Sequence, residues 1–277
     1  MLPEGTDRLI DLALAEDLPA GDVTTDCVVP DGALSKAAFT AKAEGLLAGI
    51  DVAARVFERV DSRVRFDPLT ADGRAVACGE VLARVEGPAA AILKAERTAL
   101  NFLQRLSGIA SATGAYVRAV AGTKARILDT RKTTPGWRAL EKYAVRMGGG
   151  VNHRMSLSDM ILVKDNHIAL AGSVDEALRR VRAKAPAGLT VEVEVRSLDQ
   201  AKSAVEGGAT MIMLDNMDAK DMRRVVAWVA GRVPVEASGG MSLERVGEAA
   251  RLGVDYISVG ALTHSFRSLD ISLDFEG

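Results

Sequence analysis

The feature that most constrains the fold is an alternation of short apolar segments with amphipathic helical segments in the second half of the chain. Repeated strand–helix units of this length require parallel strands joined by helical crossovers. The alternation therefore predicts an α/β fold, and six clear strands with a hidden seventh favour a barrel over an open sheet. The six predicted strands are residues 125–130, 160–164, 190–195, 211–216, 235–238 and 256–260.

Neither of the two glycine-rich nucleotide motifs, G-x-G-x-x-G or G-x-x-x-x-G-K-[ST], occurs in the chain. A doubly wound dinucleotide-binding sheet normally carries such a loop after its first strand. The absence of both motifs supports the barrel interpretation.

The first part of the chain has a different pattern. Apolar residues recur at helical spacing over residues 5–16, whereas the Gly and Asp residues of 17–26 predict a loop. Residues 36–87 predict short strands packed with one helix, and a long helical segment begins at residue 89. We expect that helix to break at Ser107-Gly108, because glycine disfavours a helix interior.

Residues 73–87 resemble the hairpins of biotinyl-like carrier modules, in which glycines set tight turns. Such a carrier needs a modifiable lysine at the hairpin tip, and this segment contains no lysine. The carrier interpretation is therefore weak.

The charge distribution favours a small anionic ligand. The formal net charge is -2, which argues against nucleic acid as a partner. Residues 124–164 nevertheless contain nine Lys and Arg residues and only three acidic residues. Such a local positive field suits a small, multiply charged anion.

The remaining composition predicts a cytoplasmic protein without a zinc or redox motif. Cys27 and Cys78 are the only cysteines, and neither belongs to a C-x-x-C pair. The first residues lack a signal-peptide core, and no run of eighteen apolar residues could span a membrane.

Charged, amide or glycine residues follow all six predicted strands. In α/β barrels the chemistry gathers at the carboxyl ends of the strands, so these residues are expected to meet in one site. One charged residue at a strand end is usually a solvated loop residue, but six such ends in one barrel make that interpretation improbable. The residues are Arg131 and Lys132, Lys164 to His167, Glu192 and Glu194, Asp215 and Asn216, Gly239 and Gly240, and Gly260.

Two glycine-containing turns, residues 238–240 and 258–261, follow the last two predicted strands. Barrels often bind phosphate at this place, because backbone N–H groups and a helix N-terminus converge on the anion. The turns therefore predict a phosphate site, although tight strand–helix connections alone would also explain them.

Glu194 and Asp215 are predicted on neighbouring strands within this cationic region. Carboxylates in such a place can hold Mg²⁺, or they can form ion pairs with Lys132 and Lys164, and the sequence leaves both possibilities open. Among the three histidines, His153 precedes Arg154 and is predicted to donate to a substrate anion. No H-E-x-x-H pattern predicts zinc.

Three segments carry a specific family resemblance: ERTALNFLQRLSGIA at 96–110, DTRKTTPGWRALEKYAVRMGGGVNHR at 129–154 and ILVKDNHI at 161–168. They resemble quinolinate phosphoribosyltransferase. Shorter segments at 16–26, 213–217, 236–240, 257–265 and 269–273 agree, so the resemblance covers essentially the whole chain.

The resemblance implies an N-terminal open α/β sandwich at 1–107 and an incomplete, seven-stranded-type α/β barrel at 108–265. A tail at 266–277 would return to the first domain. It also implies a homodimer or larger assembly whose active sites are completed by a neighbouring subunit. The implied reaction joins quinolinate to phosphoribosyl pyrophosphate (PRPP) with Mg²⁺, releasing nicotinate mononucleotide, pyrophosphate and CO₂ for de novo NAD biosynthesis.

The resemblance also assigns roles to residues. Lys132, Lys164, Glu194 and Asp215 would form the catalytic set, with the two lysines spanning both substrates and the two acids holding the ribose hydroxyls or Mg²⁺. Quinolinate would be bound by Arg131, His153 and Arg154, with Arg97 reaching in from the partner subunit, and Thr130 would join this substrate-binding set. Phosphate would be cradled by Ser238, Gly239, Gly240, Gly260 and Ala261.

Two positions depart from the family pattern. Ser156 stands where glycine or a similar residue is expected, and Trp137 stands where leucine is usual. Neither is a charged site residue, so they bear on loop packing rather than on chemistry.

Three rival functions remain open from the sequence. A related protein associated with molybdenum transport would use another anionic acceptor. A Schiff-base lyase on a similar barrel would use Lys164 as its nucleophile, although the adjacent Asp165 works against the lowered lysine pKa that this requires. A non-catalytic anion-binding protein would have little use for so many converging charges.

Overall fold

The structure, a computed structural model, describes residues 2–276 and divides into two compact units. The first unit comprises the residues up to 114, residues 133–149 and the residues from 262 onward. The second comprises residues 115–132 and 150–261. The domain boundaries expected from the sequence, at residues 107/108 and 265/266, stay predictions.

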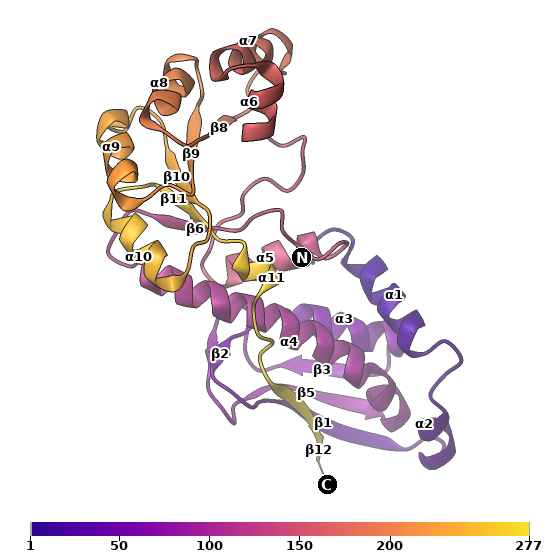
Figure 1. Ribbon diagram of the computed structural model, residues 1–277. Coiled ribbons are helices and arrows are strands. Elements are labelled where there is room, and N and C mark those ends of the chain that lie inside the picture. Colours follow the sequence, from indigo (N-terminus) through magenta and orange to yellow (C-terminus); the bar gives the residue numbers. More distant parts are fainter. Residues whose placement is uncertain (1, 277) are drawn as a thin grey trace. The chain divides into compact units, whose positions relative to one another are not determined.

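The first unit is built on a four-stranded antiparallel sheet with the order β12-β1-β5-β3. Its strands are β1 (Leu34–Ala41), β3 (Arg65–Pro68), β5 (Val81–Pro88) and β12 (Ile271–Phe275). A two-stranded sheet joins β2 (Gly45–Leu46) to β4 (Ala75–Val76). Figure 1 shows the helices α1 (Thr6–Asp17), α2 (Val23–Val28), α3 (Ile50–Val60), α4 (Ala89–Ala119) and α5 (Arg138–Met147).

An aromatic cluster forms part of the core of the first unit. Phe39 of β1 and Phe57 of α3 are both fully buried, and their ring centroids lie 5.9 Å apart in an edge-to-face arrangement. Burying a side chain of this size contributes about 1.5–3 kcal/mol. β1 alternates partly buried and buried residues towards its C-terminal end, as expected for a sheet that packs helices on one face.

The predicted break in the long helix at Ser107-Gly108 is wrong, because α4 continues from Ala89 to Ala119. Ser107 is buried, and its Oγ accepts a hydrogen bond from the backbone N–H of Ala48 at 3.0 Å. A Cβ atom at position 108 would lie 2.3 Å from the carbonyl oxygen of Arg267. The two small residues therefore allow close packing against other segments and do not end the helix.

The predicted loop at 17–26 is wrong in its second half, where α2 begins at Val23. The Asp22 carboxylate accepts a hydrogen bond from the backbone N–H of Thr25 at 3.0 Å and caps the helix. A capping aspartate favours a helix start as well as a loop, and here it starts a helix.

The segment that follows Lys132 is anchored within the first unit. Arg105 donates to Thr134 Oγ1 and to Glu141 Oε1, both at 2.5 Å, and Glu141 is fully buried. The Arg105 guanidinium also lies 5.0 Å from the ring centroid of Trp137, which stacks on Phe102 with centroids 4.8 Å apart. The unusual Trp137 therefore extends an aromatic and cationic stack.

The second unit is a six-stranded parallel sheet with the order β6-β11-β10-β9-β8-β7. Its strands are β6 (Arg126–Leu128), β7 (Ile161–Val163), β8 (Val191–Val195), β9 (Met211–Asp215), β10 (Val235–Ser238) and β11 (Tyr256–Ser258). β6 and β7 are edge strands, so the barrel is incomplete, as predicted. The hidden seventh strand is reduced to one bridge between Val151 and Leu128.

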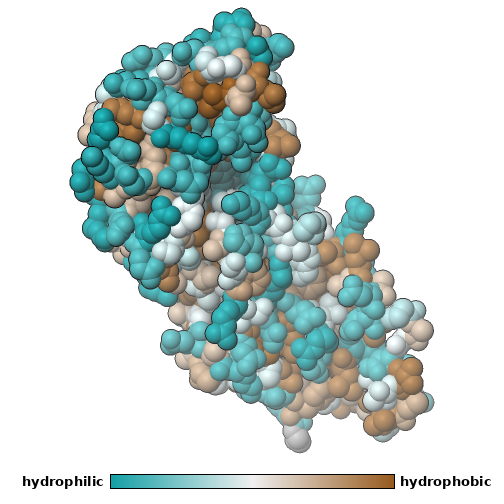
Figure 2. All heavy atoms as spheres, in the orientation of Figure 1, coloured by the Kyte–Doolittle hydropathy of each residue, from teal (hydrophilic) through white to brown (hydrophobic). Residues whose placement is uncertain are grey.

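Helices cover the outside of this sheet. They are α6 (Asp165–Ala171), α7 (Val174–Lys184), α8 (Leu198–Glu206), α9 (Ala219–Val229) and α10 (Leu243–Arg251), while α11 (Ala261–His264) follows β11. Figure 1 shows α8, α9 and α10 following the strand order around the sheet, and Figure 2 shows mainly hydrophilic residues over α8 and α9. Within the described residues no helix has the length and apolarity needed to cross a bilayer.

Strand β8 shows how the sequence places polar groups inside this unit. Val193 and Val195 are fully buried, while Glu192 and Glu194 occupy the alternate positions. Because successive side chains of a strand point to opposite faces, the two glutamates lie on the inner face. The V-E-V-E-V repeat therefore directs two carboxyl groups to the inner face of the sheet.

Candidate active site

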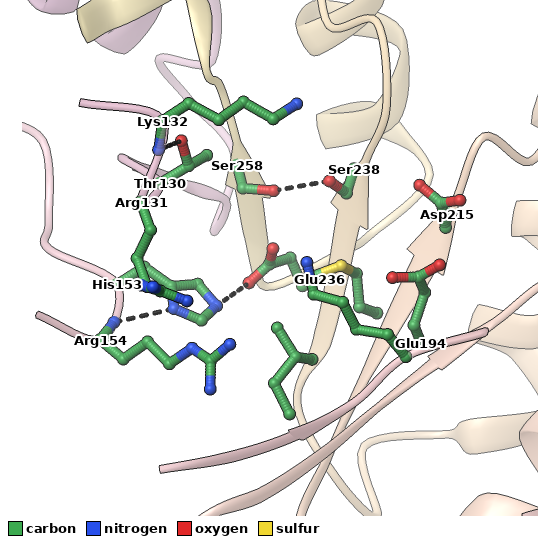
Figure 3. A pocket seen from close by; sticks show the side chains of 13 residues that line it. Thr130, Arg131, Lys132, His153, Arg154, Glu194, Asp215, Glu236, Ser238 and Ser258 are labelled. Atoms are coloured by element: carbon green, nitrogen blue, oxygen red, sulfur yellow. Dashed lines mark hydrogen bonds and ion pairs between the residues drawn. The ribbon is translucent and has the colours of Figure 1, made fainter. Parts of the chain in front are cut away.

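A pocket of 320 Å³ opens at the carboxyl ends of the strands of the second unit (Figure 3). Its volume is within the range of small-molecule sites. Nine of the predicted site residues line it, namely Thr130, Arg131, Lys132, His153, Arg154, Lys164, Glu194, Asp215 and Ser238. Four residues that were not predicted as site residues complete the lining: Leu162, Met213, Glu236 and Ser258.

Asp129 organises the cationic wall of the pocket. This fully buried carboxylate accepts hydrogen bonds from the backbone N–H of His153 at 2.9 Å and from Asn152 Nδ2 at 2.5 Å. It therefore fixes the chain segment that carries His153 and Arg154. The Arg154 guanidinium donates to the carbonyl oxygen of Met160 at 3.1 Å, which orients the side chain further.

Two arginines lie close enough on this wall to affect each other. Burial lowers the pKa of Arg154, and the nearby charge of Arg131 lowers it further. A like-charge pair in a partly buried wall is stabilised when an anion binds between or beside the two guanidinium groups. The wall is therefore suited to carboxylates, which guanidinium groups can bind with paired hydrogen bonds.

His153 has both ring nitrogens engaged within the site. Nδ1 accepts a hydrogen bond from the backbone N–H of Arg154 at 2.8 Å, so in neutral His153 the proton is on Nε2. Nε2 lies 3.1 Å from Glu192 Oε2 and 3.5 Å from Glu236 Oε2. The imidazole therefore directs its proton at a carboxyl pair, and its predicted contact with a substrate anion stays a prediction.

Glu192 and Glu236 form a buried carboxyl pair at the pocket, and Glu236 is part of its lining. Both side chains are fully inaccessible, and one oxygen of Glu192 and both oxygens of Glu236 have no hydrogen-bond partner within normal geometry. Burial raises the pKa of Glu192 to about 7. Burial and the neighbouring Glu192 raise the pKa of Glu236 to about 8. The pair therefore retains a proton near neutral pH.

The ligand atoms of His153, Glu192 and Glu236 all lie within 4.8 Å of one another, which is close enough to surround a metal ion. The hydrogen bonding of the histidine does not fit that use. A neutral histidine that binds a metal through Nε2 carries its proton on Nδ1, and that proton would oppose the N–H of Arg154. The carboxyl pair is better described as an acceptor for the histidine proton.

The acidic wall consists of Glu194 and Asp215, whose side chains are 10% and 15% exposed. Burial raises the pKa of Glu194, and the negative charges of Asp215 and Asp165 raise it further. The ion pairing of these acids with Lys132 and Lys164 stays a prediction, and the structure adds Arg196 as a partner of both acids. Its Nη2 lies 3.3 Å from Asp215 Oδ2 and 3.7 Å from Glu194 Oε1.

The two lysines enter the pocket from the ends of β6 and β7. The backbone N–H of Lys132 donates to Thr130 Oγ1 at 3.0 Å, which shapes the turn after β6. The backbone N–H of Lys164 donates to His167 Nδ1 at 3.0 Å at the start of α6. This contact gives His167 a structural role at the start of α6.

The glycine turn after β10 packs closely against Asn216, the residue that follows β9. Gly239 has a φ of 94°, and a Cβ atom there would lie 2.2 Å from Asn216 Oδ1. Ser238 Oγ accepts a hydrogen bond from Ser258 Oγ at 2.9 Å, which joins the ends of β10 and β11. The turn thus brings backbone close to the pocket, as a phosphate site requires.

The remaining predicted residues do not line the pocket. Gly240 follows Gly239 in the same turn, and Gly260 and Ala261 follow β11 at the start of α11. Arg97 lies exposed on α4, in the part of that helix that belongs to the first unit. Their roles in binding stay predictions.

The residues that sequence reasoning missed follow from strand periodicity. Glu236 lies two residues before Ser238, so the two side chains share one face of β10, and Arg196 follows Glu194 at the same two-residue spacing, one residue beyond the end of β8. Extending the alternation by one residue pair in each direction would have identified both. Leu162 and Met213 belong to strands recognised only as apolar.

The comparisons with known proteins agree with this geometry. The C-terminal domain model of quinolinate phosphoribosyl transferase matches residues 109–274, and the N-terminal domain model matches residues 22–107. Nicotinate-nucleotide pyrophosphorylase [carboxylating] of Mycobacterium leprae is 48% identical, with 95% of this chain and 94% of the relative covered. The probable enzyme of the same name from Bacillus subtilis is 43% identical, with 96% and 92% covered.

Solved structures give the same result. NadC from Streptococcus pyogenes is 43% identical and has a TM-score of 0.96, with 100% of this chain and 97% of that chain covered. The nicotinate-nucleotide pyrophosphorylase from Francisella tularensis is 37% identical and has a TM-score of 0.95, with 100% and 98% covered. By these matches in both of its halves, the chain belongs to the quinolinate phosphoribosyltransferase family.

Proposed function

We propose that this chain is a nicotinate-nucleotide pyrophosphorylase (carboxylating) of de novo NAD biosynthesis. It transfers the phosphoribosyl group of PRPP to quinolinate, and the products are nicotinate mononucleotide, pyrophosphate and CO₂. The observation that carries the proposal is a single pocket with Arg131 and Arg154 on one wall and Glu194 and Asp215 on another. The near-full-length relatives named for this activity support it.

The arginine wall is the proposed binding site of quinolinate. Quinolinate has two carboxylates on one ring, and Arg131 and Arg154 supply two guanidinium groups whose mutual repulsion an anion relieves. Lys132 and Lys164 line the same pocket and would contact both quinolinate and PRPP. The two carboxylates of quinolinate, bound by the arginines, hold the ring so that its nitrogen faces the ribose.

The acidic wall is the proposed binding site of the ribose. When the ring nitrogen attacks the anomeric carbon, the bond from that carbon to pyrophosphate breaks and positive charge develops on the sugar. Glu194 and Asp215 stabilise that charge, because fixed groups of opposite sign lower the energy of a charged transition state. The turns at Ser238–Gly240 and Gly260-Ala261 would bind phosphate through backbone N–H groups.

The same two carboxylates fit Mg²⁺. Mg²⁺ prefers oxygen ligands and is usually bound by one or two carboxylates together with water and substrate phosphates. Glu194 and Asp215 offer such oxygens. Burial raises the pKa of Glu194 and the negative charge of Asp215 raises it further, so a cation bound beside the two groups would favour their charged forms. The ion would neutralise charge on the pyrophosphate group.

Decarboxylation follows from the alkylated ring and needs no covalent catalyst. The pyridinium takes up the electrons of the broken bond to CO₂, and the ring carbon then takes a proton. Lys164 is exposed at the start of α6 and adjoins Asp165, surroundings that do not favour a Schiff-base nucleophile.

The chain is also proposed to work as a homodimer or larger assembly in which Arg97 enters the site of a neighbouring subunit. Arg97 is exposed on α4, as such a role requires. Val23, Val28 and Leu34 of the first unit are more than 70% exposed, an unusual exposure for apolar residues that favours contact with another protein surface.

The deciding experiment measures ¹⁴CO₂ release and nicotinate mononucleotide formation from carboxyl-labelled quinolinate. Both products are expected only when PRPP and Mg²⁺ are present together. Glu194→Gln and Asp215→Asn should impair the use of PRPP more than quinolinate binding, whereas the control Glu176→Gln, in α7 and outside the pocket lining, should behave like the wild type. Decarboxylation without PRPP, or trapping of substrate on Lys164 by borohydride, would contradict the proposal.

A further inference from the structure

Arg196 joins three carboxylates at the acidic wall. Its Nη2 atom lies 2.9 Å from Asp165 Oδ2, 3.3 Å from Asp215 Oδ2 and 3.7 Å from Glu194 Oε1. The hydrogen bond to Asp215 and the charge of Asp165 raise the pKa of Arg196, so the guanidinium is charged at every working pH. One cationic side chain therefore neutralises part of the charge of the proposed metal-binding wall.

The backbone N–H of Arg196 is held by a hydrogen bond, whereas its side chain is largely exposed. The backbone N–H donates to Gln200 Oε1 at 2.8 Å, and the next residue, Ser197, caps α8 by accepting from the backbone N–H of Gln200. The Arg196 side chain is 55% exposed, so it can leave the wall without breaking packed contacts. A change of rotamer is therefore sufficient to move the charge.

Asp165 offers a place to which the guanidinium can withdraw. It is the nearest of the three carboxylates, is 46% exposed and lies at the start of α6, outside the acidic wall. An arginine that keeps this contact can release Asp215 and Glu194 without losing all of its ion pairs. The arrangement thus has two states, with the guanidinium on the wall or on Asp165 alone.

We propose that Arg196 is a built-in counter-ion that competes with the divalent cation for Glu194 and Asp215 and withdraws to Asp165 when the metal–diphosphate substrate binds. The inference rests on the proposed function, because it assumes that these two acids face Mg²⁺ and PRPP. Arg196 offsets part of the negative charge of the wall, and its withdrawal makes binding of the metal an exchange of one cation for another.

The size of the effect follows from the exposure of the contacts. Exposed ion pairs contribute about 0.2–1 kcal/mol each, and Arg196 makes two contacts that the metal would replace. Two such contacts sum to about 0.4–2 kcal/mol, so removing this competitor should tighten divalent-cation binding by about 2–30-fold. Because exposed charges are screened, the difference should shrink as salt rises from about 0.05 M to 0.5 M.

The test uses Mn²⁺ as a spectroscopic probe on the full chain. Free Mn²⁺ is measured by electron paramagnetic resonance in titrations of the wild type, Arg196→Gln and the control Arg179→Gln. Arg179 is an exposed arginine of α7 that pairs with Glu176, so its replacement makes the same change in net charge away from the pocket. Arg196→Gln should bind Mn²⁺ about 2–30-fold more tightly than the other two proteins at low salt.

A second measurement follows binding of Mg²⁺–PRPP by calorimetry without quinolinate. Equal or tighter binding by Arg196→Gln supports competition, whereas weaker binding would make Arg196 a ligand of the diphosphate and overturn the proposal. Equal Mn²⁺ affinities of wild type and Arg196→Gln would also overturn it. Failure of the proposed function is a separate result, because it requires that the wild type form no nicotinate mononucleotide.

Discussion

Replacing Glu236 with glutamine is expected to stabilise the protein at neutral and alkaline pH. Glu236 is fully buried, and burial together with Glu192 raises its pKa from 4.5 to about 8. At pH 7 the folded protein holds this carboxyl protonated, while the unfolded chain ionises it. This difference lowers the free energy of unfolding by about 3 kcal/mol at pH 7 and by up to about 5 kcal/mol above pH 8.

The sign follows from proton binding. Because the folded-state pKa is raised, the folded protein binds more protons than the unfolded chain between pH 4.5 and about 8. The contribution of Glu236 to stability is therefore fully present below pH 4.5 and is lost as pH rises through about 8. Glutamine has nearly the same shape and does not titrate, so Glu236→Gln should flatten this part of the pH profile.

The assay is urea denaturation followed by circular dichroism, at four pH values from 5 to 8, for wild type and Glu236→Gln. The exposed control Glu248→Gln of α10 should stay within about 0.5 kcal/mol of the wild type at each pH. The gain of Glu236→Gln should grow with pH. A variant less stable than the wild type at pH 8, or one that keeps the wild-type pH dependence, would refute the reasoning.

Three further predictions concern other parts of the chain. Mixing an Arg97→Ala subunit with an Arg131→Ala subunit, each inactive alone, should restore activity by creating one intact shared site, and no recovery despite verified subunit exchange would contradict sharing. Gly239→Ala should lower PRPP affinity at least tenfold in calorimetry, because its Cβ would lie 2.2 Å from Asn216 Oδ1 in a left-handed turn, and unchanged affinity would show that the turn tolerates a side chain. Arg105→Ala should lower the urea-unfolding free energy by about 3–5 kcal/mol, because it leaves the buried Glu141 charge uncompensated, while a loss below about 1 kcal/mol would mean that solvent replaces the pair.

The parallel sheet could be predicted because its strands have a strong local signal. Each apolar segment is bounded by polar turns and followed by an amphipathic helix, and this order is sufficient to place Lys164, Glu194 and Asp215 at one edge. The first unit was less predictable. Whether Ser107-Gly108 ends a helix depends on the carbonyl of Arg267, about 160 residues away, and local propensity contains no information on that contact.

The site was predicted incompletely for a related reason. Residues at the visible ends of strands, such as Arg131 and Asp215, attract notice because they interrupt apolar segments. Glu236 is the second residue of β10, which begins at Val235. The pKa of its carboxyl group depends on Glu192 of β8, two strands away in the sheet. Arg196 lies beyond a strand end, and its partners come from three different segments of the chain. Such contacts depend on which strands are neighbours in the sheet, and that order cannot be read from the sequence.

The pairing of β12 with β1 has a consequence for synthesis of the protein. Phe39 pairs with Leu273, so the first sheet cannot acquire its fourth strand until residues 271–275 have emerged from the ribosome. The parallel sheet lies wholly within residues 126–258 and can be completed earlier. During translation the long-range antiparallel pairing is therefore the last to form, and β1 has an unpaired edge during that interval, the kind of edge to which chaperones and aggregating chains bind.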